Sequence, residues 1–202
     1  MCRNCQILII IFFLVMLFGC KTNTKTNTEV QEPTREQVVN PVDTVEWSMQ
    51  TYGTSGLSFE SPILLVKEDI SEDLAESIRA VMSKTETYMG MINEEAMMMS
   101  NFAVYQDGIP LNLEQAAQGS VNEMLRSVNG DLIEMTRKDL DYDGKPAILQ
   151  EGSAFTNSGS VEFKNLIIME APNMWQVSVL HKADEAELQS LASRIISSVA
   201  FN

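Results

Sequence analysis

The chain has 202 residues and carries 28 acidic side chains against 14 Lys and Arg, which gives a net charge of −14 at pH 7. Such a surface repels phosphates, so composition argues against nucleic acid as a partner and against binding to anionic lipid headgroups. The three cysteines, Cys2, Cys5 and Cys20, all lie in the first twenty residues. We therefore expect no disulfide, thiolate metal site or cysteine nucleophile in the rest of the chain.

Residues 1–19 have the layout of a bacterial export signal, with Arg3 followed by the apolar run from Ile7 to Phe18. Twelve helical residues reach about 18 Å, less than the roughly 30 Å of a bilayer core, so a stable spanning helix is not expected. The sequence Leu17-Phe-Gly-Cys20 resembles the lipobox of bacterial lipoproteins, although Phe18 is bulkier than usual. The resemblance implies that Cys20 becomes the acylated N-terminus. An uncleaved anchor, or an ordinary signal with an incidental cysteine, is the alternative.

Residues 20–44 are expected to be the lipidated cysteine and a disordered tether, because the segment is polar and has no aromatic residue. The acyl chains on Cys20 would then be the only link to a membrane. By resemblance to sorting rules, Lys21 after the cysteine favours the outer membrane of a Gram-negative cell. In a cell with one membrane, the same signal predicts the outer face of the plasma membrane.

Residues 45–202 are expected to form a single domain, and its first elements are two strands. Trp47 and Met49 alternate with polar residues in the first strand, and Leu57 and Phe59 are separated by the polar Ser58 in the second. A helix is predicted next, and its apolar face would carry Leu74, Ile78, Val81 and Met82 behind Asp69 or Ser71 as N-cap. Residues 97–105 suit a central strand. A second helix is predicted behind Asn112, with Gln115 placed as in a capping box, and it carries Leu113, Ala117, Val121, Met124 and Leu125 on one face.

The second half predicts a meander closed by a helix. A hairpin joins strands near 132–142 and 147–155, and further strands are expected at 161–169 and 174–181. Turn signals at 157–159 and 171–173 are short, which implies antiparallel pairing. The third helix carries Leu188, Leu191, Ala192, Ile195 and Val199 in one stripe, opened by Asp184 and Glu187. The expected class is α+β, a largely antiparallel sheet with helices packed on it.

In this order of elements, the chain resembles Mog1/PsbP-like proteins of the PsbP/DUF1795 type. The likeness rests on Leu57-Ser-Phe-Glu-Ser-Pro62, Gly144-Lys-Pro-Ala147, Trp175 and the segment from Ser193 to Phe201. The resemblance implies an α/β/α sandwich that serves as a non-enzymatic scaffold. It supplies no functional residues that could be carried over to this chain, and a fold does not settle a function.

Asp139, Asp141, Asp143 and Gly144 match the start of an EF-hand calcium loop. Pro146 and Gln150 then occupy the positions where such a loop needs an aliphatic residue and a bidentate glutamate. Asp143-Gly144 is also a strong type I′ turn dipeptide. We interpret this stretch as a plain hairpin, with a weak calcium site as the alternative.

Five methionines fall within eleven residues: Met89, Met91, Met97, Met98 and Met99. Thioethers are soft ligands that favour Cu(I). In a strand, however, Met97 and Met99 point one way and Met98 the other, which disperses any site of three thioethers. Core packing or a soft binding surface is the expected role, and copper binding is the alternative.

No other residues form a recognisable catalytic motif. His181 ends the apolar face of its strand and is expected to be structural, and the acidic pairs Glu94-Glu95 and Glu72-Asp73 are expected to be solvated. We therefore predict a non-enzymatic, membrane-anchored envelope lipoprotein without a cofactor, which binds another protein or a small apolar ligand. A metal-handling lipoprotein is the second hypothesis, and a hydrolase the third.

Overall fold

The computed structural model describes residues 46–70 and 76–201. The predictions for residues 1–44, including Cys20, lie outside this part of the chain. The elements are β1 (Ser48–Thr51), β2 (Leu57–Ser61), β3 (Val66–Glu68), α2 (Glu76–Arg79), β4 (Met82–Ile92), β5 (Ala96–Tyr105), α3 (Leu113–Ser127), β6 (Asp131–Tyr142), β7 (Lys145–Thr156), β8 (Gly159–Glu170), β9 (Asn173–Lys182), α4 (Ala186–Ser197) and β10 (Ala200–Phe201). None of these helices is long and apolar enough to cross a bilayer.

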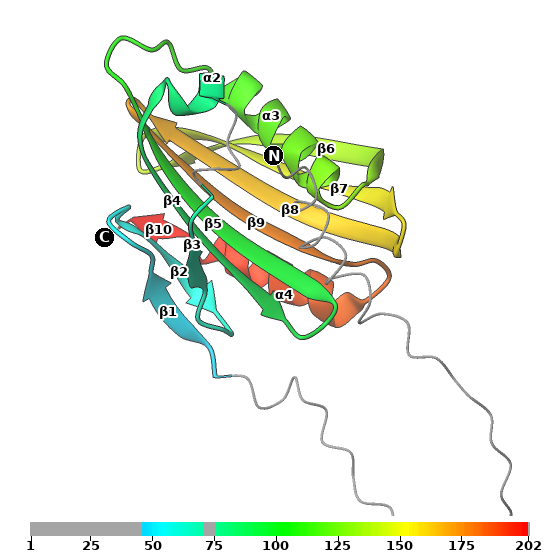
Figure 1. Ribbon diagram of the computed structural model, residues 1–202. Helices are drawn as coiled ribbons and strands as arrows, with labels where there is room; N and C mark the ends of the chain where they lie inside the picture. Colours follow the sequence, from blue (N-terminus) through cyan, green and yellow to red (C-terminus); the bar gives the residue numbers. More distant parts are fainter. Residues whose placement is uncertain (1–45, 71–75, 202) are drawn as a thin grey trace, which may run out of the picture. The chain divides into compact units, whose positions relative to one another are not determined.

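The strands form two antiparallel sheets. The larger has seven strands in the order β3-β4-β5-β9-β8-β7-β6, and the smaller has the order β1-β2-β10. Helices α3 and α4 lie on opposite faces of the larger sheet, and the small sheet lies on the α4 side (Figure 1). We call these faces the α3 face and the α4 face. The predicted α+β class is confirmed, with helices packed on a largely antiparallel sheet.

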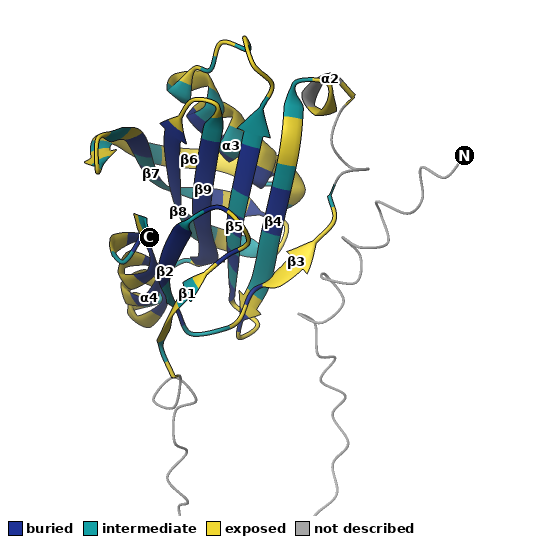
Figure 2. Cartoon of the chain, turned by 90° about the vertical axis from the view of Figure 1, so that its left-hand side faces the viewer, coloured by how far each residue is buried: buried dark blue, intermediate teal, exposed yellow. Residues whose placement is uncertain are grey.

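The α4 face holds the main core. Phe59 from the small sheet, Met98 from β5 and Ile195 from α4 are all fully buried there. Trp175 packs against Phe102 and Phe201, and its indole Nε1 donates a hydrogen bond to the carbonyl of Ser55 at 2.9 Å. Figure 2 shows the buried centre of the large sheet beside the exposed edge strand β3.

Under α3 the sheet buries a polar network as well as apolar side chains. Asn165 is fully buried, and its Nδ2 donates to Gln150 Oε1 at 2.9 Å and to Ser120 Oγ at 2.9 Å. Asn165 Oδ1 accepts from Gln176 at 3.0 Å and from Ser178 at 2.7 Å. In the described part of the chain, each buried side-chain nitrogen or oxygen has a hydrogen-bond partner, as burial without water requires.

Several local predictions are confirmed. Asn112 caps α3 by accepting a hydrogen bond from the Gln115 N–H at 3.0 Å. The β6–β7 hairpin turns at Asp143 and Gly144, whose φ values of 55° and 81° fit the expected type I′ turn. Asp141 Oδ1 also accepts from the Gly144 N–H at 2.7 Å, so this carboxylate stabilises the turn.

Two predictions are wrong. The first predicted helix is present only as the short α2, which ends at Arg79, so its predicted extension through Val81 and Met82 is wrong and Met82 begins β4. Residues 82–92 pair with β5 along nearly the whole length of that strand. Their backbone hydrogen bonds to β5 take the place of the hydrogen bonds that a helix would have formed. The N-cap of α4 is Glu185 rather than Asp184, which takes a positive φ of 64° in the turn before the helix.

A buried carboxylate ties β4 to the loop after β1. The side chain of Glu86 is only 8% exposed, and its Oε2 accepts from the Thr54 N–H at 3.0 Å. Burial alone would raise the Glu86 pKa, but the Thr54 hydrogen bond together with Lys84 and Lys67 holds that pKa below its usual value. The carboxylate is thus charged and stabilising in the folded domain near neutral pH.

Candidate functional site

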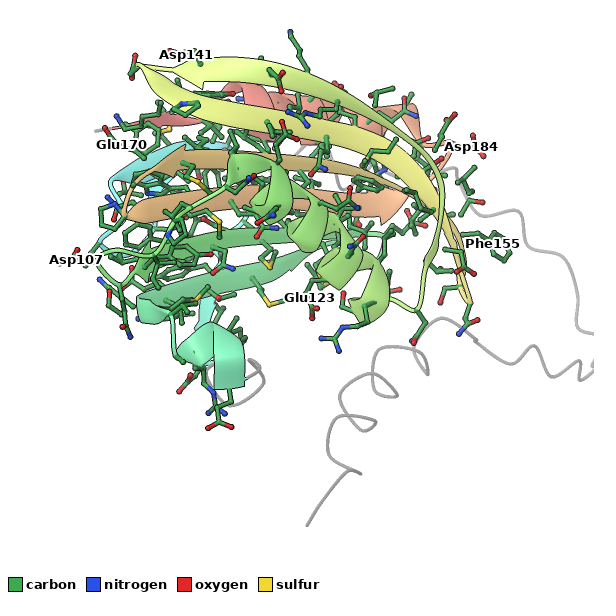
Figure 3. The ribbon with its side chains drawn as sticks, turned by 90° about the horizontal axis from the view of Figure 1, so that it is seen from above. Asp107, Glu123, Asp141, Phe155, Glu170 and Asp184 are labelled. Atoms are coloured by element: carbon green, nitrogen blue, oxygen red, sulfur yellow. The ribbon has the colours of Figure 1, made fainter. Side chains whose placement is uncertain are left out.

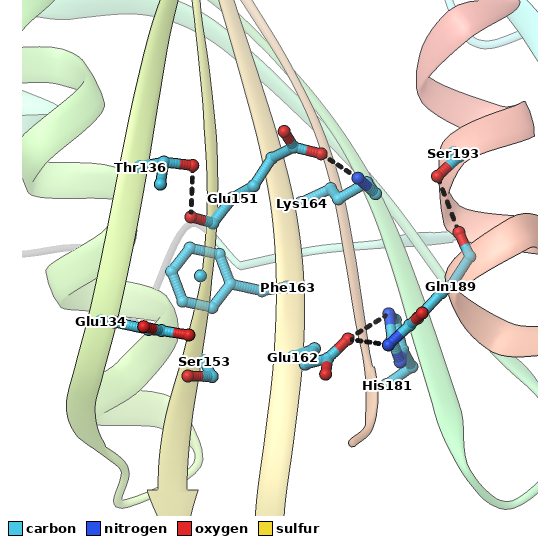
Figure 4. A pocket seen from close by; sticks show the side chains of 11 residues that line it. Glu134, Thr136, Glu151, Ser153, Glu162, Phe163, Lys164, His181, Gln189 and Ser193 are labelled. Carbon is cyan, nitrogen blue, oxygen red and sulfur yellow. Dashed lines mark hydrogen bonds and ion pairs between the residues drawn. The ribbon is translucent and has the colours of Figure 1, made fainter. Parts of the chain in front are cut away.

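An open pocket lies on the α4 face beside α4, where β6, β7 and β8 extend beyond the helix (Figure 4). Its volume is about 380 Å³. The sheet contributes most of the lining and α4 contributes two polar side chains. The lining residues are Glu134, Thr136, Glu151, Gly152, Ser153, Glu162, Phe163, Lys164, His181, Gln189 and Ser193.

The backbone around Gly152 shapes the floor of this pocket. Gly152 pairs with Met135 across β6 and β7, next to the β-bulge between Leu132 and Glu134. A Cβ atom at Gly152 would lie 2.8 Å from Phe163 Cζ and 3.1 Å from Met135 Cα, and nearer still to the carbonyl oxygen of Glu134. Only glycine therefore fits this close approach of the two strands.

One wall of the pocket is an ion pair between Lys164 on β8 and Glu151 on β7. The two residues are direct cross-strand partners, and the lysine side chain is 20% exposed. Burial lowers the pKa of Lys164 below its usual value. The hydroxyl of Thr136 donates to the Glu151 carbonyl oxygen at 3.3 Å, so the groups on this wall already have partners.

The opposite wall pairs Glu162 on β8 with His181 on β9 (Figure 4). The imidazole is almost fully buried, and its Nδ1 lies 2.8 Å from the Lys182 carbonyl oxygen, so Nδ1 carries the proton. His181 Nε2 lies 4.0 Å from Glu162 Oε2, too far for a direct hydrogen bond. Gln189 of α4 donates to the same carboxylate oxygen at 2.9 Å.

The hydroxyl groups in the pocket are not aimed at the histidine. Ser193 donates to the Gln189 carbonyl oxygen at 2.8 Å within α4. Ser153 lies across the pocket from His181, beside Glu134 (Figure 4). The arrangement does not bring a serine, a base and an orienting acid into the hydrogen-bonded sequence of a serine-type triad.

The rim of the pocket is acidic, and an exposed aromatic residue follows its lining along β7. Glu134, Glu151 and Glu162 contribute three carboxylates against the single cation of Lys164. Two residues beyond Ser153 on β7, Phe155 is 59% exposed and projects from the edge of the domain (Figure 3). The site can therefore accept hydrogen bonds from a cationic or amide-bearing ligand and offers an aromatic surface next to them.

The methionines predicted from the sequence are separated by the sheet, as expected from strand alternation. Met98 is fully buried in the core of the α4 face, whereas Met97 packs with the cluster under α3. Strand β4, which sequence patterning missed, adds a further feature. Its Met89 and Met91 are the direct partners of Met99 and Met97, so four methionines share the α3 face.

The other predicted candidates are not brought together. Asp139 forms an ion pair with Arg137, and Asp141 serves the turn. Glu95 pairs with Lys182 at 3.0 Å, while Glu72 and Asp73 lie outside the described residues. Among the residues described, no group of three or more His, Cys, Asp or Glu side chains is placed to hold a metal ion.

The Glu162–His181 pair was not anticipated from the sequence, where His181 was interpreted as structural. The signal that could have found it is the short turn at Ala171-Pro172. A two-residue connection fixes the register of the flanking strands and makes residues 162 and 181 direct partners.

No family model and no curated protein match this chain. Its fold resembles that of the solution structure of cyanobacterial PsbP, CyanoP, from Synechocystis sp. PCC 6803, with a TM-score of 0.55 and 11% identity over 81% of this chain and 96% of that one. A protein of unknown function from Pseudomonas aeruginosa aligns with a TM-score of 0.36 and 11% identity, over 73% and 90% of the two chains. The likeness to CyanoP shows that the domain has a PsbP-like α+β fold.

Proposed function

We propose that this protein is a non-catalytic binding module, tethered to an envelope membrane through acyl chains on Cys20, and that its pocket takes a basic segment of a partner protein. The observation that carries the proposal is the acidic pocket beside α4, with the exposed side chain of Phe155 two residues beyond its lining residue Ser153 on β7. The lipobox-like sequence before Cys20 supplies the argument for the anchor. Through this anchor, the protein would be attached to the outer membrane of a Gram-negative cell, or to the outer face of the plasma membrane in a cell with one membrane.

A binding role fits the pocket better than catalysis. Lys164 is neutralised by Glu151, and the buried imidazole of His181 donates to a backbone carbonyl. These contacts hold the side chains in fixed positions, which suits recognition. Most residues that line this pocket have polar side chains, which suit a charged or amide-bearing ligand better than the small apolar ligand that the sequence also left open for the protein.

The charge of the chain identifies the kind of partner segment. A net charge of −14 attracts cationic surfaces and repels nucleic acid. A lysine or arginine side chain entering the pocket would meet the carboxylates of Glu134 and Glu162. A neighbouring apolar residue of the same segment would lie on Phe155, so the preferred sequence combines basic and apolar residues.

The test is site-specific photo-crosslinking in the native host, with the intact chain. A photoreactive residue at Ser153 in the pocket is expected to trap one partner repeatedly, whereas the same residue at Gln118, exposed on α3, is the matched control. The double variant Glu134→Gln/Glu162→Gln preserves side-chain shape, and we expect it to reduce the adduct at least about tenfold. Equal crosslinking at both positions, or an adduct insensitive to the charge change, would refute the proposal.

The anchor is tested separately. Mass spectrometry of the mature protein should find an N-terminal Cys20 carrying a diacylglyceryl thioether, and Cys20→Ser should leave the protein without it. A mature chain that retains Met1, or an unmodified Cys20, would contradict the membrane attachment without affecting the pocket.

A further inference from the structure

Four methionine side chains form a two-by-two array on the α3 face of strands β4 and β5. The register places Met89 opposite Met99 and Met91 opposite Met97. Alternation confirms the face, because Tyr88 and Met98 pack in the core on the other side. Directly opposed residues in antiparallel strands have Cβ atoms about 4.5–5.5 Å apart, so the four flexible side chains start close together.

The array is less buried than the methionines that fill the core, although Met97 also packs against the cluster under α3. Met98, Met124, Met169 and Met174 are buried, with at most 9% of their surface exposed. Met89, Met97 and Met99 are only partly buried, and Met91 is 38% exposed. Helix α3 packs on β7 and β8, which leaves the outer part of β4 and β5 less covered. Figure 3 views this side, with sulfur atoms among the side chains beside α3.

The surroundings suit a soft monovalent cation. A thioether is a neutral ligand that needs no deprotonation, and soft sulfur ligands select Cu(I) over harder ions. Met99 pairs with Ser178 and Met97 with Leu180 on β9, so the inner border of the array carries no formal charge. The net charge of the chain lowers the cost of holding a cation there.

We propose that Met89, Met91, Met97 and Met99 form a thioether site for Cu(I). Rotation about the three side-chain bonds of each methionine brings the sulfurs towards a common centre, and three or four of them would coordinate the ion. The site lies on the face opposite the acidic pocket, so the test of this proposal does not depend on the proposed function.

The experiment is anaerobic titration of the full chain with Cu(I) against a competing chelator, and with Ag(I) as a redox-stable probe. Cys2→Ser, Cys5→Ser and Cys20→Ser remove the thiols that would otherwise compete. Methionine methyl groups labelled with carbon-13 report which thioethers bind. We expect one ion per chain, with methyl shifts at the four array positions and none at Met98.

Leucine substitutions separate coordination from packing, since leucine keeps the apolar volume. Met89→Leu/Met99→Leu is expected to weaken binding at least about tenfold, whereas Met49→Leu, at an exposed methionine on β1, should leave it unchanged. Undiminished binding in the array variant overturns the proposal. So does the absence of binding, or shifts spread equally over Met49 and the array, which would indicate a generally soft surface.

Discussion

Gly152 provides the sharpest test of the packing that creates the pocket. A methyl group there would lie 2.8 Å from Phe163 Cζ, well inside normal van der Waals contact, and would also press on the backbone of β6 at Glu134. The aromatic ring is fully buried and the carbonyl belongs to a paired strand, so neither can move freely. Overpacking of this kind costs about 1–3 kcal/mol, and Gly152→Ala should destabilise the domain by that amount.

The matched control is Gly119→Ala. Gly119 lies in the interior of α3, and a Cβ atom there would meet nothing within 4 Å. The same chemical change should therefore stabilise the protein by about 0.5–1 kcal/mol through helix propensity.

Thermal and urea unfolding of both variants measures the contrast. At about 2–4 °C per kcal/mol for a domain of this size, Gly152→Ala should lower Tm by about 2–12 °C and Gly119→Ala should raise it by about 1–4 °C. If Gly152→Ala unfolds at the wild-type temperature while Gly119→Ala behaves as expected, the close approach of β6, β7 and Phe163 is wrong.

Three further substitutions test the interior. Glu86→Gln should cost about 1–3 kcal/mol at pH 7. Because folding lowers the pKa of Glu86, its carboxylate stabilises the folded domain above the unfolded pKa of about 4.3, and this stabilisation is lost as the pH falls through the folded pKa. Denaturant titrations at pH 7 and pH 3 should therefore show that the free energy lost in the variant is smaller at pH 3. An equal loss at both pH values would contradict a charge effect. Asn165→Leu leaves a buried polar network without its centre, and calorimetry should show a loss of about 3 kcal/mol or more; a neutral result would refute the network. Trp175→Phe removes the hydrogen bond to Ser55 and part of the core volume, and a loss below about 1 kcal/mol in urea unfolding would contradict its burial.

Local chemistry explains the parts of the fold that were predictable. The cap at Asn112 and the turn at Asp143-Gly144 depend on residues adjacent in sequence, so single-chain patterning predicts them. The same holds for α4, whose apolar stripe is regular and whose Leu188 and Ile195 are buried as expected.

Strand β4 could not be predicted from local sequence patterns, because contacts with distant segments of the chain decide that these residues form a strand. Its residue Glu86 is charged yet buried, and its partners Thr54 and Lys67 come from other segments. Met82 matched the helical spacing of the preceding apolar residues, so periodicity assigned it to the wrong element. Missing this strand also hid the methionine array, since two of its four members belong to β4.

Both proposed sites lie where the large sheet is not covered by other elements, because the sheet is wider than the helices and the small sheet that pack on it. A helix about 10 Å across covers roughly two strands spaced about 4.8 Å apart, and the large sheet has seven strands. On the α4 face, α4 packs on β8 and β9 and the small sheet packs over β4 and β5, so β6 and β7 remain open at the acidic pocket. On the α3 face, α3 packs on β7 and β8 and leaves the outer part of β4 and β5 to the methionines.

The open regions are on opposite faces and on different strands, so substitutions in one region should leave the measurement made on the other unchanged. A loss of Cu(I) binding on Glu134→Gln/Glu162→Gln, or of the crosslinked adduct on Met89→Leu/Met99→Leu, would show that the two regions are coupled through the sheet and that this account of its coverage is wrong.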